Sequence, residues 1–204
     1  VDDGVSLLAD TLCDLVPNTG RIGLPMGLET HLRMPIADYL RLTDRLAPRQ
    51  MVDATGVLHR VREIKSEPEI EKIRTTCRIA ADAFAQVPNF AHAGQPLDQV
   101  FRNFQIALLQ GGADWVSYVA GGAGPDGYGD VISPADNRPL ERGDVLMLDT
   151  GAMRNGWFCD FDRNYAVGPP SQTVRDAQMR LAEATHAAAD VARPGVRACD
   201  VHAA

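Results

Sequence analysis

The sequence predicts an α+β protein, and three patterns in its 204 residues support that fold class. Apolar residues recur every three or four positions over the longer stretches, as they do in amphipathic helices. Two apolar runs flank Asn155-Gly156, a dipeptide that favours a β-hairpin because both of its residues tolerate a positive φ. The first third of the chain alternates helical and strand patterns, which indicates a small α/β unit ahead of the hairpin.

Residues 1–65 are expected to form this α/β unit. The expected elements are helices at Val5–Leu15 and 35–46 and strands at Arg21–Leu24 and Gln50–Asp53, with residues 57–58 continuing the last strand. Two short strands are too few to close a stable sheet by themselves. The chain begins with Val rather than Met and opens directly in a helical pattern, so we expect it to be a fragment.

Residues 66–204 are expected to form a second domain. The clearest helical pattern covers residues 61–87, within which Ser66 and Glu69 have the spacing of a capping box. The other expected elements are a strand at 115–120 and helices at Leu97–Gln110, at 171–192 and from 196 onward. Residues 121–129 are rich in glycine but lack the spacing of a phosphate-binding loop, so we expect a tight loop beside a pocket.

The predicted hairpin brings three acidic residues together. A turn at Asn155-Gly156 pairs Arg154 with Trp157, which places Asp149 opposite Asp162. Asp160 then lies diagonal to Asp149, and because side chains alternate between faces, all three carboxylates emerge on one face. Carboxylates crowded on an apolar hairpin repel one another unless a cation or protons bind. The sequence therefore predicts a metal site.

The alternative is that these acids face solvent, as acids commonly do on the polar side of an antiparallel sheet. Asp is depleted in strands, however, and Asp149 follows an apolar run at residues 145–148 that has no polar alternation. These two observations favour the metal interpretation.

The segment LDTGAMRNGWFCDFDRNYAVG resembles the metal-binding hairpin of the superfamily of methionine aminopeptidase, Xaa-Pro dipeptidase and aminopeptidase, and creatinase, whose fold is called pita-bread. The family pattern has an Asp that closes a strand, a Gly two residues later, a second Asp, a basic residue, an aromatic residue and a final Gly. The matching positions here are Asp149, Gly151, Asp160, Arg163, Tyr165 and Gly168. Where the family has a hydroxyl residue, two positions after the second Asp, this chain has Asp162. Residues 62–70 also resemble the family's linker into its catalytic domain.

The resemblance, which is to the creatinase and prolidase branch, implies an organisation and a cofactor. Residues 1–65 would be part of a creatinase-like amino-terminal α/β domain, and residues 66–204 the first part of a pita-bread metallohydrolase domain. It implies a homodimer and two divalent cations (Mn²⁺, Co²⁺, Zn²⁺ or Fe²⁺) held by two Asp, one His and two Glu. Asp149 and Asp160 match the two Asp, with Asp162 and Arg163 just behind them. The remaining ligands would follow Ala204, so the site is expected to be incomplete in this chain and the fragment inactive.

The stretch after the glycine-rich loop departs from the family. In its peptidase members a His in this place contacts the substrate, whereas residues 128–134 here contain no His. Tyr128, Asp130 and Ser133 are the candidates for a substrate-binding group. The five histidines of the chain form no metal-ligand pair of their own.

The amino-acid composition excludes some classes of binding partner and indicates the cellular compartment. The net charge is −7 and no Lys/Arg cluster occurs, so nucleic acid and anionic membrane are poor partners. The chain has no signal-peptide pattern and no apolar stretch of membrane-spanning length. Its four cysteines are scattered, which fits a cytoplasmic protein with mostly buried thiols.

The resemblance implies a metal-dependent hydrolase of the Xaa-Pro dipeptidase or aminopeptidase type, which attacks short peptides or other small amides with a metal-bound hydroxide. The absent loop His favours a second interpretation, a family member that acts on a small metabolite such as an ectoine- or creatine-like amide, or a lyase for a sulfonium compound. A third is a catalytically inactive binding module. The retained Asp149 and Asp160 disfavour the third, because clustered acids are costly to keep.

Overall fold

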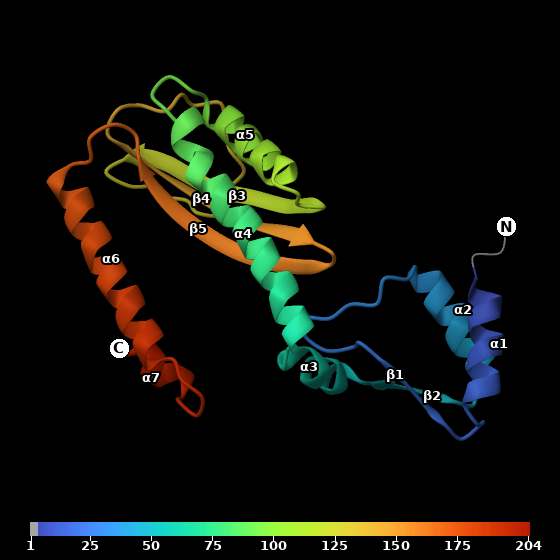
Figure 1. Ribbon diagram of the computed structural model, residues 1–204. Coiled ribbons are helices and arrows are strands. Elements are labelled where there is room, and N and C mark those ends of the chain that lie inside the picture. The colour runs from blue at the N-terminus through green and yellow to red at the C-terminus, as the bar shows by residue number, and fades with distance from the viewer. Residues whose placement is uncertain (1–3) are drawn as a thin grey trace. The chain divides into compact units, whose positions relative to one another are not determined.

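The computed structural model describes residues 4–204 and confirms the α+β fold class (Figure 1). The chain divides into two compact units between Ser66 and Glu67. Within the described residues, no helix is long and apolar enough to cross a membrane.

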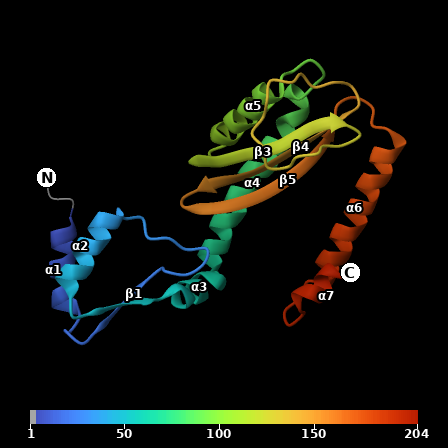
Figure 2. The same cartoon turned by 180° about the vertical axis from the view of Figure 1, so that it is seen from behind.

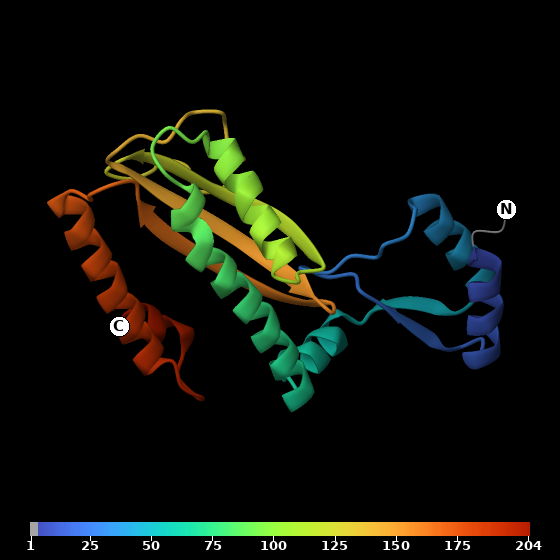
Figure 3. The same ribbon diagram turned by 45° about the horizontal axis from the view of Figure 1, so that its top comes forward.

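Within residues 4–66, the first unit contains three helices and two strands. These are α1 (Val5–Leu15), β1 (Arg21–Leu24), α2 (Ile36–Leu46), β2 (Gln50–Asp53) and α3 (Thr55–Glu63). The two strands pair in parallel, and α1 and α2 lie side by side (Figure 3). A small apolar core joins them, made of Val5, Ala9, Ile22, Leu42 and Leu46.

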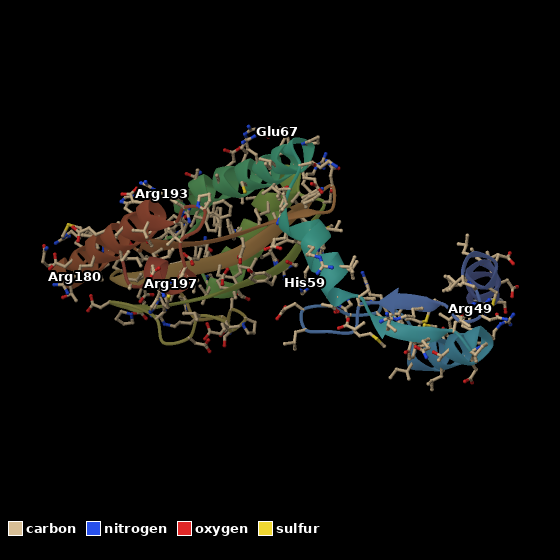
Figure 4. The ribbon with its side chains drawn as sticks, turned by 90° about the horizontal axis from the view of Figure 1, so that it is seen from below. Arg49, His59, Glu67, Arg180, Arg193 and Arg197 are labelled. Atoms are coloured by element: carbon tan, nitrogen blue, oxygen red, sulfur yellow. The ribbon has the colours of Figure 1, made fainter. Side chains whose placement is uncertain are left out.

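Arg49, labelled in Figure 4, ties β2 to the end of α1. Its guanidinium donates from Nε to the Val16 carbonyl at 2.7 Å and from Nη2 to the Cys13 carbonyl at 3.0 Å. The last carbonyls of a helix have no partner within the helix, so this side chain satisfies groups that α1 leaves open.

The predicted strand at residues 57–58 is wrong, because these residues belong to α3. The change from strand to helix occurs at Asp53, whose Oδ1 accepts a hydrogen bond from the Thr55 backbone N–H at 2.9 Å. A short polar side chain that bonds the backbone two residues ahead favours a turn over a continuing strand.

The predicted single helix over residues 61–87 is also wrong. α3 ends at Glu63, and a separate helix α4 (Glu67–Phe90) follows. Pro68 accounts for the break: in one continuous helix its ring would clash with the Ile64 carbonyl, whereas in the first turn of a new helix it is tolerated.

The second unit is built on a three-stranded antiparallel sheet. Its elements are α4, α5 (Leu97–Gln110), β3 (Trp115–Pro125), β4 (Asp144–Arg154), β5 (Trp157–Ala166), α6 (Gln172–Val191) and α7 (Ala198–His202). The strand order is β3-β4-β5, so β4 lies in the centre. α4 and α5 cover one face of the sheet (Figure 1), and Figure 2 shows the sheet from its other face, called the open face below.

Alternation along β4 separates the two faces. Leu146, Leu148 and Ala152 are fully buried and belong to the core formed with α4 and α5. Burial of one such Leu side chain contributes roughly 1.5–3 kcal/mol. Asp149 and Gly151 alternate with these residues and therefore belong to the open face.

The glycine-rich stretch is partly strand rather than loop, which corrects the expectation for residues 121–129. β3 continues to Pro125, and Gly122 pairs with Met147 of β4. Glycine is needed because the following loop lies against the strand: a Cβ at position 122 would lie 2.7 Å from the Asp130 carbonyl oxygen. At position 124 it would lie 2.5 Å from the Gly127 carbonyl oxygen.

The four cysteines are unpaired, but the expectation that most of them are buried is wrong. Cys159 is buried between β5 and α4, Cys199 is exposed, and Cys13 and Cys77 are half-buried.

Candidate functional site

The β4–β5 hairpin has the register that the sequence predicts. Arg154 pairs with Trp157, and Asp149 pairs with Asp162. The turn residues Asn155 and Gly156 have φ values of 53° and 78°, as a type I′ turn requires.

Both predicted metal-binding acids reach the same hydroxyl group. The Tyr118 hydroxyl lies 3.2 Å from Asp149 Oδ1 and 2.8 Å from Asp160 Oδ1, and it donates its proton toward both. The two carboxylates therefore lie on one face and converge on one point, which confirms the predicted placement of this pair.

Gly151 is the middle residue of a row that joins Tyr118 to Asp160 across the sheet. Tyr118 on β3 pairs with Gly151 on β4, and Gly151 pairs with Asp160 on β5, so the three form a row across the strands. A Cβ at position 151 would lie 3.7 Å from Tyr118 Cε1 and 2.7 Å from the Cys159 carbonyl oxygen. The Cys159 carbonyl oxygen therefore requires the glycine of the family pattern at position 151, whereas a Cβ would make only ordinary van der Waals contact with the Tyr118 ring.

Sequence reasoning missed Tyr118. Residues 115–120 were expected to be a strand, but their register against β4 depends on contacts between distant parts of the chain. That register also shifts between Val116 and Tyr118. An aromatic residue in the strand before an Asp-x-Gly strand end is the one local signal that could have pointed to it.

The electrostatics of the pair disfavour two negative charges. Partial burial raises the pKa of Asp149, and the charges of Asp160 and Asp162 raise it further, against the opposing hydrogen bond from Tyr118. Burial and the hydrogen bond to Asp160 also raise the pKa of Tyr118, so its hydroxyl remains a donor at neutral pH. A cation at this point would relieve the repulsion.

The expected third carboxylate does not complete a cluster. Among residues 4–204, no group of three or more His, Cys, Asp or Glu side chains is arranged to hold a metal ion. Asp162 pairs with Asp149 across the strands, but the hydrogen bonds of the Tyr118 hydroxyl go to Asp149 and Asp160. The described part of the chain thus offers two carboxylates at this place.

Arg163 lies on the opposite face of the hairpin. Arg163 is exposed, and its guanidinium carbon is 5.1 Å from the Phe161 ring and 5.8 Å from the Phe84 ring of α4. The structure therefore does not bring Arg163 to the two acids, although it follows Asp162 directly in the sequence.

The three loop candidates line one cavity of about 380 Å³ beside residues 121–123 of β3. Asp130 accepts hydrogen bonds from the Ser133 hydroxyl and from the Ile132 N–H at 3.0 Å, and these bonds lower its pKa. Asp130 is thus held as a charged acceptor, which leaves Tyr128 as the candidate proton donor of the loop. The lining of the cavity includes neither Asp149 nor Asp160.

Arg138, which also lines this cavity, forms an ion pair with the buried Asp144. Arg138 donates from two nitrogens to the two Asp144 oxygens at 2.8 and 3.0 Å, and the Glu141 N–H donates to the same carboxylate at 2.8 Å. Burial alone would raise the pKa of Asp144, but these hydrogen bonds outweigh it and lower the pKa. The sequence analysis did not single out either residue.

Comparison with known proteins extends these observations. The family model of metallopeptidase family M24 matches residues 71–204. The probable dipeptidase PepE of Mycobacterium tuberculosis is 32% identical over 183 residues, which cover 89% of this chain and 48% of the relative. The Xaa-Pro dipeptidase of Pyrococcus furiosus is 26% identical over 195 residues, which cover 93% of this chain and 53% of the relative.

The solved structures agree with the sequence relatives. The crystal structure of dipeptidase PepE from Mycobacterium ulcerans superimposes with a TM-score of 0.75 at 30% identity, covering 99% of this chain and 52% of that one. The chain thus spans about half the length of the relatives that it matches.

Proposed function

Because the chain belongs to metallopeptidase family M24, we propose that Asp149 and Asp160 hold divalent cations for the hydrolysis of short peptides of the Xaa-Pro type. The observation that carries this proposal is the convergence of the two carboxylates on one point, the Tyr118 hydroxyl. The names of the relatives, a probable dipeptidase and an Xaa-Pro dipeptidase, support the substrate class.

The residues fit a divalent cation in their chemistry. Carboxylate oxygens are the donors that such hard cations prefer. Burial, and after it the charges of Asp160 and Asp162, raise the pKa of Asp149, and a cation would offset both effects. A divalent cation takes about six donors, so the pair supplies part of a coordination shell and water or further protein groups supply the rest.

Each residue has a separate task in the proposed reaction. Bound cations supply Lewis acidity, which lowers the pKa of water and polarises an amide carbonyl. Asp149 and Asp160 fix the place of that chemistry on the open face of the sheet. Tyr128 offers a hydroxyl donor from the loop cavity, because Asp130 is occupied as an acceptor.

The loop supports a second candidate, hydrolysis or cleavage of a small metabolite rather than a peptide. Residues 128–134 contain no His, and a lost donor to a developing oxyanion typically costs about 10²–10³ in kcat. A substrate that needs no such donor would suit the loop better than a peptide does.

An activity panel on the natural full-length protein separates the two. The panel holds Xaa-Pro dipeptides and small non-peptide amides and sulfonium compounds, each assayed before and after chelation and after Mn²⁺, Co²⁺, Zn²⁺ or Fe²⁺ is restored. We expect metal-dependent turnover of Xaa-Pro dipeptides that Asp160→Asn abolishes and that Asp82→Asn, an exposed acid on α4, leaves unchanged. Turnover confined to a non-peptide compound would favour the second candidate, and full activity without metal would contradict the proposed role of Asp149 and Asp160.

A further inference from the structure

The Tyr118 hydroxyl is hydrogen-bonded to both of the acids that are proposed to hold a cation. Its oxygen lies 3.2 and 2.8 Å from the Oδ1 atoms of Asp149 and Asp160. A divalent cation bound to both oxygens would lie about 2.0–2.6 Å from each, so it would compete with the hydroxyl for the same two acceptors. We propose that Tyr118 is a placeholder, a positioning residue that holds the two carboxylates together in the metal-free protein and gives way to the first cation. This inference rests on the proposed function.

The geometry allows the ring to move while its backbone stays fixed. The Tyr118 carbonyl accepts a hydrogen bond from Thr150 Oγ1 at 2.7 Å, which anchors it to β4. The side chain, by contrast, is 41% exposed and belongs to no core cluster. Because Gly151 presents no side chain beneath the ring, the phenol can leave the acids without displacing packed atoms.

The repulsion between the Asp149 and Asp160 carboxylates explains why a hydrogen-bond donor or a cation beside them is stabilising. The hydroxyl has one proton for two carboxylates, so it offsets their repulsion only in part. A divalent cation offsets the repulsion more fully and removes the need for the hydrogen bonds. The hydroxyl therefore stabilises the metal-free protein and opposes metal binding.

The test is the variant Tyr118→Phe, which removes the hydroxyl and keeps the ring. Calorimetric titration of the metal-free protein with Mn²⁺ should show about tenfold tighter binding than the wild type, because hydrogen bonds to charged groups are no longer lost on binding. The melting temperature of the metal-free variant should fall by about 2–4 °C. Mn²⁺ should also change the tyrosine ultraviolet absorbance of the wild type more than that of the variant.

Tyr165→Phe is the matched control. Its hydroxyl donates to the Phe84 carbonyl at 2.8 Å on the opposite face of the same sheet. Loss of this hydroxyl should lower the melting temperature and leave Mn²⁺ affinity unchanged, as expected of a purely structural hydrogen bond.

The outcomes separate the placeholder role from the proposed function. Unchanged or weaker Mn²⁺ binding in Tyr118→Phe, with binding intact in the wild type, would overturn the placeholder role alone; weaker binding would make Tyr118 a ligand. No Mn²⁺ binding by the wild type would overturn the proposed function, and the placeholder role with it.

Discussion

Two aspartates on one strand have opposite surroundings. Asp144, at the start of β4, is 1% exposed and receives two hydrogen bonds from Arg138 and one from the Glu141 N–H. Asp149, five positions later, is half-buried, lies near Asp160 and Asp162, and shares the Tyr118 hydroxyl with Asp160 as a hydrogen-bond donor. The pKa of Asp144 is lowered, whereas that of Asp149 is raised.

The difference separates an acid that supports the fold from one that is costly to it. A buried carboxylate that is hydrogen-bonded and paired keeps its charge because these contacts offset the cost of removing it from water. Acids that oppose each other across strands destabilise a sheet. A bound cation would therefore offset the charge of Asp149, whereas the charge of Asp144 is already offset by Arg138.

The substitution of Asp144 is expected to change the stability of the protein most. Asp144→Asn should destabilise the protein by about 3 kcal/mol, because it leaves the Arg138 guanidinium without its charge partner. The value lies at the lower end for buried pairs, since Arg138 keeps 33% of its side chain exposed. Urea unfolding of the metal-free protein measures it. A loss below about 0.5 kcal/mol would show that the pair does not support the fold.

Asp149→Asn should change the free energy of unfolding in the opposite direction. Removing one of the facing charges should stabilise the metal-free protein by up to about 1 kcal/mol, because like charges across neighbouring strands repel. The same variant should bind Mn²⁺ more weakly. A clear loss of stability in the metal-free state would contradict the predicted difference between Asp149 and Asp144.

The smallest effect, a dependence on pH, sharpens the comparison further. Because the pKa of Asp144 is lowered on folding, the ionised Asp144 side chain stabilises the folded protein at pH values above its unfolded pKa, about 3.9. This stabilisation is lost as the pH falls through the folded pKa. The raised pKa of Asp149 means that its ionised form costs stability at neutral pH, and this cost vanishes as pH falls through the folded pKa. In urea unfolding between pH 7 and about 4, the gain from Asp149→Asn should shrink while the loss from Asp144→Asn persists. Parallel pH profiles for the two variants would contradict this assignment.

The parts of the fold that depend on neighbouring residues could be predicted from the sequence. Asn155-Gly156 fixes its own turn type, and the turn fixes the register, so the placement of Asp149 and Asp160 follows from residues 145–168 alone. Helix α5 and the strand β2 were predicted in the same way, from local periodicity.

The features that the sequence did not predict depend on distant contacts or on competing local signals. Tyr118 meets the acids because β3 pairs with β4, a contact that crosses 31 positions to Asp149. Residues 57–58 have strand-forming side chains, yet Asp53 turns the chain into α3. The family resemblance placed Asp162 and Arg163 together behind the metal ligands, but adjacent strand residues point to opposite faces.

The central claim is that Asp149 and Asp160 form a cation-binding pair. Its most direct test is calorimetric titration of the metal-stripped protein with Mn²⁺, in the wild type, in Asp160→Asn and in the control Asp82→Asn. We expect binding in the wild type and the control and at least about 100-fold weaker binding in Asp160→Asn, because an amide keeps the shape but loses the charge that holds the cation. Equal Mn²⁺ affinity in Asp160→Asn and the wild type would contradict the claim.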